Sequence, residues 1–161
     1  MQIRTATIKD LNELIEIEQE CFPVAEAASR ESMEQRLSVF PECFWILEDN
    51  DKIVSFVNGM VTKESNLLDE MYEDANIHTF QGDWQMIFGV DTRVEYRKQG
   101  YAAQLLEYVI EQVRNQNRKG IVLTCKEKLI PYYAKFGFEN EGISCSTHGD
   151  VIWYQMRLCL K

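Results

Sequence analysis

Paired cysteines are missing from this sequence. The five cysteines (Cys21, Cys43, Cys125, Cys145 and Cys159) are odd in number and widely spaced, and no C-x-x-C pair occurs. This spacing excludes the usual zinc-binding motifs and argues against a disulfide framework. We therefore expect reduced, mostly buried thiols in a cytoplasmic protein, and no metal site.

Long hydrophobic runs and an excess of positive charge are also absent. No stretch approaches the roughly 20 apolar residues of a membrane-spanning helix, and residues 1–5 do not resemble the start of a signal peptide. Lys and Arg number 17 against 26 Asp and Glu, so the net charge is −9. A field of this sign opposes binding to nucleic acid or to anionic lipid. We expect a small-molecule ligand, with no nucleic-acid or membrane partner.

The length and the hydrophobic content, 161 residues and 45%, predict one domain over residues 1–161 with a substantial core. Periodicity and turn residues predict an α/β (α+β) fold with a mixed sheet and helices on both of its faces. The polar stretch 63–83 lacks periodicity, so we expect a mobile loop there, near an acceptor site. The predicted strands are 2–6, 44–48, 53–62, 84–90, 121–124 and 151–160, and the predicted helices are 7–20, 30–39, 100–115 and 129–136.

A glycine turn joins the predicted strand 84–90 to the clearest helix of the chain. Gly100 lets the backbone approach a ligand closely, and the free N–H groups at a helix start favour a phosphate or pyrophosphate. Arg93, Arg97 and Lys98 add positive charge nearby. An ordinary helix start with solvated basic residues explains the same pattern. The turn matches neither the P-loop motif nor the three-glycine dinucleotide motif.

Four stretches of the sequence together resemble a known family. Arg97-Lys98-Gln99-Gly100-Tyr101-Ala102 matches the (R/Q)-x-x-G-x-(G/A) signature of the GNAT N-acetyltransferase superfamily, and 131–138 resembles its second, aromatic motif ending in F-G-F. Residues 21–29 and 125–133 are similar to the arylalkylamine (serotonin) N-acetyltransferase branch. The resemblance covers nearly the whole chain.

This resemblance implies that acetyl-CoA binds where strands four and five splay apart, at 84–90 and 121–124. The amides after Arg97 would hold the pyrophosphate, and an amide near Val90 would polarise the thioester carbonyl. The turn is two residues longer than is usual in the superfamily. The implied cofactor-binding residues are Phe88, Gly89, Val90, Arg97, Lys98, Gln99, Gly100, Tyr101, Ala102, Ala103, Tyr132 and Tyr133. The implied substrate-binding residues are Phe22, Pro23, Glu26, Ser29, Trp84 and Met86.

The same resemblance assigns Tyr133 as the general acid, because a phenol stays protonated at neutral pH and can donate to the sulfur of coenzyme A. Tyr132 and Tyr133 are equally compatible with packed aromatics. The branch's two catalytic histidines are replaced here by Trp84 and Met86. The remaining candidates for the general base are His78, Glu26, Asp91 and a chain of water molecules. We interpret His148 and Cys125 as structural.

The sequence thus predicts acetyl transfer from acetyl-CoA to the primary amine of a small molecule. The alternative is a weakly active or inactive acyl-CoA-binding protein of the same fold. We expect a monomer or a homodimer.

Overall fold

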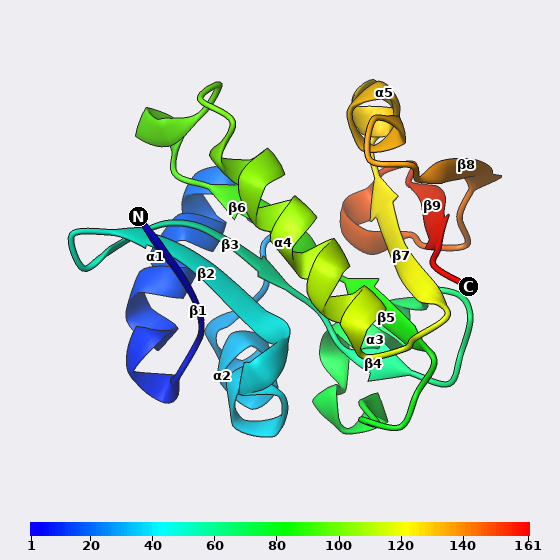
Figure 1. The fold of residues 1–161 in the computed structure, drawn as a ribbon, viewed down its shortest axis with the longest axis horizontal. Coiled ribbons are helices and arrows are strands. Elements are labelled where there is room, and N and C mark those ends of the chain that lie inside the picture. The colour runs from blue at the N-terminus through cyan, green and yellow to red at the C-terminus, as the bar shows by residue number, and fades with distance from the viewer.

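The computed structural model describes all residues from 1 to 161. A strand and a pair of helices come first, and groups of one to three strands separated by single helices follow (Figure 1). The strands are β1 (Gln2–Thr5), β2 (Phe44–Asp49), β3 (Lys52–Asn58), β4 (Val61–Thr62), β5 (Trp84–Ile87), β6 (Gly89–Thr92), β7 (Gly120–Cys125), β8 (Glu139–Ile143) and β9 (Tyr154–Cys159). The helices are α1 (Leu11–Cys21), α2 (Arg30–Val39), α3 (Asp69–Glu73), α4 (Tyr101–Asn115) and α5 (Ile130–Ala134).

The sheet consists of two parts that separate after β5. One part has the order β1-β2-β3-β6 and the other the order β4-β5-β7-β9-β8. β5 runs parallel to β7 up to the pair Ile87↔Leu123, and β6 then pairs only with β3, from Gly89↔Asn58 onward. The break lies at Phe88, whose N–H donates to Asn58 O at 2.7 Å. Strands four and five of the prediction, now β5–β6 and β7, therefore diverge as expected.

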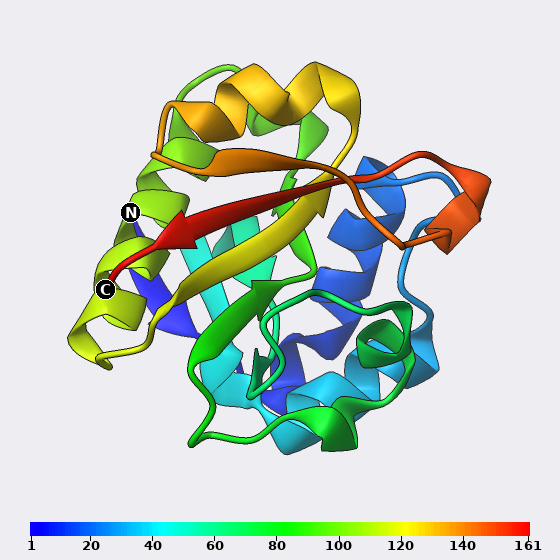
Figure 2. The same ribbon diagram turned by 90° about the vertical axis from the view of Figure 1, so that its right-hand side faces the viewer.

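Helices cover both faces of the sheet, as predicted. α1 and α2 lie on one face and α4 crosses the other (Figures 1 and 2). α4, the clearest helix of the sequence, buries an apolar stripe that runs from Leu105 to Val113. In β3 every residue from Ile53 to Asn58 is buried, as required of a strand covered on both sides.

Residues 63–83, expected to form a loop, contain regular structure. This segment contains α3 and a 3₁₀ turn, and three of its apolar side chains, Leu67, Met71 and Ala75, are almost completely buried. The three are spaced four positions apart, but α3 itself has only five residues, too few to show helical periodicity in the sequence.

Three further boundaries differ from the prediction. The expected strand 53–62 is divided into β3, which pairs with β6, and β4, which pairs with β5 in the other part of the sheet. Between them, Gly59 packs so closely against Met86 O that no side chain fits there. β8 was missed because its sequence, Glu139–Ile143, is polar and contains Gly142. The expected final strand starts later, at Tyr154.

Two other expectations concern the burial of the cysteines and the absence of a membrane-spanning helix. All five cysteines are free thiols, but only Cys43 and Cys125 are buried, whereas Cys145 and Cys159 are exposed. The expectation of mostly buried thiols is therefore wrong. None of the helices combines the length and the apolar character that crossing a bilayer requires.

Candidate active site

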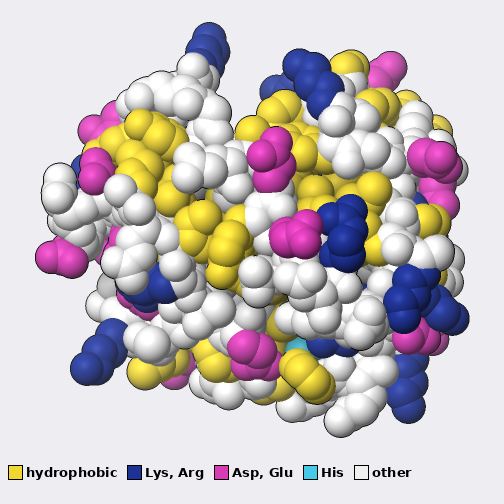
Figure 3. All heavy atoms as spheres, in the orientation of Figure 1, with side chains coloured by type: hydrophobic (Ala, Val, Ile, Leu, Met, Phe, Trp, Pro, Cys, Tyr) yellow, Lys and Arg dark blue, Asp and Glu magenta, His cyan; other side chains and the backbone are white.

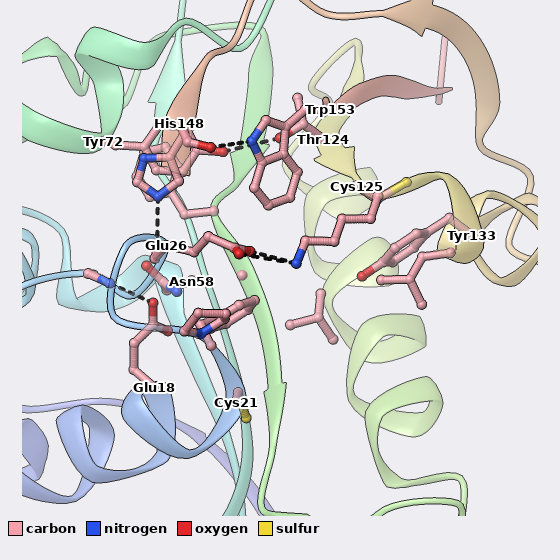
Figure 4. Close-up of a pocket in the computed structure, with 18 of the residues that line it drawn as sticks. Glu18, Cys21, Glu26, Asn58, Tyr72, Thr124, Cys125, Tyr133, His148 and Trp153 are labelled. Atoms are coloured by element: carbon pink, nitrogen blue, oxygen red, sulfur yellow. Dashed lines mark hydrogen bonds and ion pairs between the residues drawn. The ribbon is translucent and has the colours of Figure 1, made fainter. Parts of the chain in front are cut away.

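A cavity of about 210 Å³ opens where β6 and β7 diverge. Figure 3 shows the surface hollowed between the lobe that ends in the turn before α4 and the lobe that carries α5. The side chains around the cavity come from segments far apart in the sequence (Figure 4). They include Phe22, Pro23, Glu26, Tyr72, Phe88, Gly89, Val90, Thr124, Cys125, Tyr133, His148 and Trp153.

The turn before α4 offers free amides to an anion. Lys98 and Gly100 adopt left-handed conformations, with φ of +62° and +84°, and the first helical bond runs from Gln104 N to Gly100 O at 3.0 Å. The consecutive amides from Lys98 to Ala103 donate no hydrogen bond within the chain. A Cβ added at Gly100 would meet nothing within 4 Å. Free N–H groups facing open space at a helix start suit the pyrophosphate of coenzyme A.

The basic side chains of this turn do not all face outward. Arg97 turns back, and its Nε donates to Thr92 O at 3.2 Å. Arg93 is buried and ion-paired with Glu13 and Glu16 of α1. Arg97 and Lys98 are both exposed, and neither forms an ion pair within the chain. An anion at this turn would therefore find two basic side chains beside the free backbone amides, but not the third, Arg93.

β6 presents a free amide to the same cavity. Arg93 N donates to Val54 O at 3.0 Å, and amides alternate in direction along an antiparallel strand. The register Val57↔Val90 therefore directs the Val90 N–H away from β3, to the edge that faces β7. Because Val90 lines the cavity, this amide is placed to polarise a thioester carbonyl there.

The two tyrosines of α5 have different surroundings. Tyr133 lines the cavity and points its hydroxyl into it (Figure 4), and that hydroxyl makes no hydrogen bond within the chain. Burial, above all, raises the pKa of Tyr133 above its ordinary value, so the phenol stays protonated. Tyr132 does not line the cavity and packs edge-on against Tyr133 and Phe136.

An ion pair and a hydrogen-bonded cluster close one side of the cavity. Lys126 Nζ lies 2.9 Å from the buried carboxylate of Glu26. His148 Nε2 is 2.8 Å from Glu26 O, and Trp153 Nε1 donates to His148 O at 2.6 Å (Figure 4). Glu26 therefore lies in the cavity, but with an ammonium group bound to it.

Tyr72 joins this cluster from α3. Its ring stacks on His148 with the centroids 5.0 Å apart, and its hydroxyl lies 3.3 Å from Thr124 Oγ1. Sequence reasoning missed Tyr72, Thr124 and Trp153, because no local motif marks residues that meet only in the folded chain. It also took His148 as purely structural, whereas the ring lines the cavity.

Four of the residues predicted to bind the substrate or to act as the base do not line the cavity. Met86 is completely buried in the core, and Trp84 lies under the guanidinium of Arg157, 4.7 Å from the ring centre. Ser29 instead caps α2, where its Oγ accepts from Ser32 N at 3.1 Å.

His78 is the fourth of these residues. Its Nδ1 accepts a hydrogen bond from Val61 N at 3.0 Å, and its ring packs against Phe40 with centroids 4.9 Å apart. Burial lowers its pKa. His78 is thus a packed, neutral histidine outside the cavity, and the structure offers no support for it as the base.

Cys125 lines the cavity without the properties of a nucleophile. Burial raises the pKa of its thiol to about 11, and Sγ contacts Met156 Sδ at 3.5 Å. No group of three or more His, Cys, Asp or Glu side chains is arranged to hold a metal ion.

The sequence profile of the acetyltransferase (GNAT) family matches residues 11–138 of this chain. The protein belongs to that family. Among curated proteins, this GNAT protein is 23% identical to serotonin N-acetyltransferase of Mesocricetus auratus, over 99% of its own length and 78% of that protein.

Two solved structures illustrate the range of the fold. The GphF GNAT-like decarboxylase in complex with isobutyryl-CoA has a TM-score of 0.87 at 18% identity and covers 100% of both chains. The ribosomal-protein-S18-alanine N-acetyltransferase from Escherichia coli has a TM-score of 0.73 at 18% identity, over 99% of this chain and 94% of that chain. At such identities these likenesses show the GNAT fold alone.

Proposed function

We propose that this GNAT protein transfers the acetyl group of acetyl-CoA to the primary amine of a small molecule. The observation that carries the proposal is that the Val90 amide, on the open edge of β6, and the Tyr133 hydroxyl, on α5, share one cavity. The free amides from Lys98 to Ala103 lie at the start of α4, the next helix after β6.

Each feature supplies one requirement of acetyl transfer. The amides before α4 hold the pyrophosphate, which directs the pantetheine arm along β6 into the cavity. The Val90 N–H stabilises the oxyanion that forms when an amine attacks the thioester carbonyl. Tyr133 then donates its proton to the departing sulfur of coenzyme A, for which a buried, neutral phenol is well suited.

The acceptor enters a space with both apolar and polar walls. Phe22, Phe88 and Trp153 offer aromatic contacts, and Glu18 offers a carboxylate, whereas the carboxylate of Glu26 is already paired with Lys126. Aromatic rings and carboxylates both attract cations. A small amine therefore has partners in this cavity, namely the aromatic rings and the unpaired oxygen of Glu18.

The test is an acetyl-transfer assay with purified protein, acetyl-CoA and a panel of primary amines: tryptamine, phenethylamine, histamine, putrescine and spermidine. We expect free thiol to appear only when acetyl-CoA and at least one amine are both present. Raising the acetyl-CoA concentration should also raise the melting temperature, because the ligand binds only the folded chain. Stabilisation by acetyl-CoA with no thiol release across the panel would instead support a weakly active or inactive acyl-CoA-binding protein.

A further inference from the structure

Glu18 places a carboxylate oxygen without a partner in the wall of the cavity. It lies on α1 and is only 6% exposed. Its Oε2 accepts a hydrogen bond from Ala28 N at 2.9 Å, whereas Oε1 has no hydrogen-bond partner (Figure 4). Leaving a buried polar atom without a hydrogen bond is costly. An unpaired oxygen in a cavity wall therefore indicates that a group of the ligand donates the missing hydrogen bond.

A second carboxyl group, that of Asp91 on β6, lies behind Glu18. Asp91 is completely buried, and neither of its oxygens has a partner. Cys21, one turn after Glu18, contacts Thr92 O at 3.2 Å, so α1 runs along β6 and brings Glu18 to Asp91. Burial first, and then the charge of Glu18, raise the pKa of Asp91 well above its ordinary value.

Arg36 is the cation that faces this carboxyl pair. It is 4% exposed and donates to Asn58 Oδ1 at 3.2 Å, while its Nε has no partner. Cys21 adds no charge, because burial raises the pKa of its thiol. With both carboxyls ionised, Arg36 compensates only one negative charge. An ammonium group that enters the cavity compensates the other.

We propose that, in the acetyl transfer proposed above, Glu18 takes the proton from the ammonium group of the acceptor and passes it to Asp91. The inference rests on that proposed function. Glu18 lines the cavity and can touch the acceptor, whereas Asp91 acts through Glu18 by storing the proton. Such a pair solves the problem left by the missing histidines, since an amine must lose a proton before it can attack.

The step balances in atoms and charge. The ammonium proton moves to Glu18 and then to Asp91, and the freed lone pair forms the C–N bond to the thioester carbonyl. The C–S bond breaks with its electrons on sulfur, which takes the proton of Tyr133. The second nitrogen proton returns to the Tyr133 oxygen, and Asp91 releases the stored proton to solvent. The products are the amide, free coenzyme A and one proton.

The experiment compares pH profiles of kcat/KM for Glu18→Gln, Asp91→Asn and the wild type, with the panel amine that the wild type acetylates fastest. Glu18→Gln keeps an oxygen for the Ala28 N–H but cannot take a proton, so we expect a loss of about 10²–10⁴-fold. Its stabilisation by acetyl-CoA should be unchanged. Asp91→Asn removes the like charge beside Glu18, so the acid limb of the profile should move to lower pH.

Glu34→Gln on the exposed side of α2 is the matched control and should leave the profile unchanged. A Glu18→Gln enzyme with the wild-type profile, or an acid limb that Asp91→Asn does not move, would overturn the proton pair while leaving the acetyl transfer standing. If Glu18→Gln does not fold, the acid limb of the Asp91→Asn pH profile by itself decides whether the proton pair exists. A wild type that releases no thiol with any amine overturns the proposed function and this inference with it.

Discussion

Replacing Tyr133 by Phe removes one oxygen from the cavity and little else. The hydroxyl makes no hydrogen bond within the chain, and the ring keeps its edge-on contacts to Tyr132 and Phe138, with centroids 5.2 Å and 6.0 Å away. Because no hydrogen bond within the chain is broken, we expect the free energy of unfolding to change by no more than about 1 kcal/mol.

The effect on catalysis should be far larger. A general acid contributes about 10²–10⁴-fold, which corresponds to about 3–5 kcal/mol of transition-state stabilisation. The proton is donated only as the C–S bond breaks, so kcat should fall by that factor while the affinity for acetyl-CoA is retained. Steady-state thiol release, measured beside the melting-temperature shift with acetyl-CoA, separates the two quantities.

The pH profile and a second variant complete this prediction. Because burial raises the Tyr133 pKa above the ordinary value of about 10, the wild type should lose activity only in strongly alkaline solution. The Phe variant should lack that decline. Tyr132→Phe, outside the cavity, should keep kcat. Full activity in Tyr133→Phe would refute the assignment, and a loss in Tyr132→Phe alone would assign the proton to the neighbouring ring.

Three other predictions concern the anion site, His78 and α3. Gly100→Glu should abolish the melting-temperature shift caused by acetyl-CoA. The control Gly100→Ala has the same strained φ of +84° and costs about 1–2 kcal/mol of stability, but it should retain most of the shift. Equal shifts in the two variants would refute the pyrophosphate site. His78→Gln should cost about 1–3 kcal/mol with kcat nearly unchanged, and it should weaken the loss of wild-type stability below about pH 6.5. The sign follows because burial lowers the His78 pKa, so the unfolded chain binds more protons there; a large loss of kcat would return His78 to the active site. Met71→Ala, at a side chain 1% exposed, should destabilise the fold by about 2–5 kcal/mol in denaturant titration; a change below about 0.5 kcal/mol would support the mobile loop instead.

Local features of this protein could be predicted from its sequence. The stripe of α4 and the glycine turn before it depend on residues within one or two helical turns of each other, and Gly100 adopts the left-handed conformation that glycine permits. Tyr133 was assigned by a contiguous motif, and the structure places it in the cavity. In each case the information lies within a short stretch of chain, where spacing and backbone preference are sufficient.

The rest of the cavity was decided by tertiary structure. Glu18 and Asp91 are far apart in the sequence and meet because α1 packs along β6. Tyr72 reaches Thr124 and His148 only because the segment predicted as a loop folds into α3 and packs on the core. Whether a titratable side chain is a base, a packed ring or an ion-pair partner depends on its burial and its neighbours. Those depend on contacts between distant segments, which periodicity and motifs do not record.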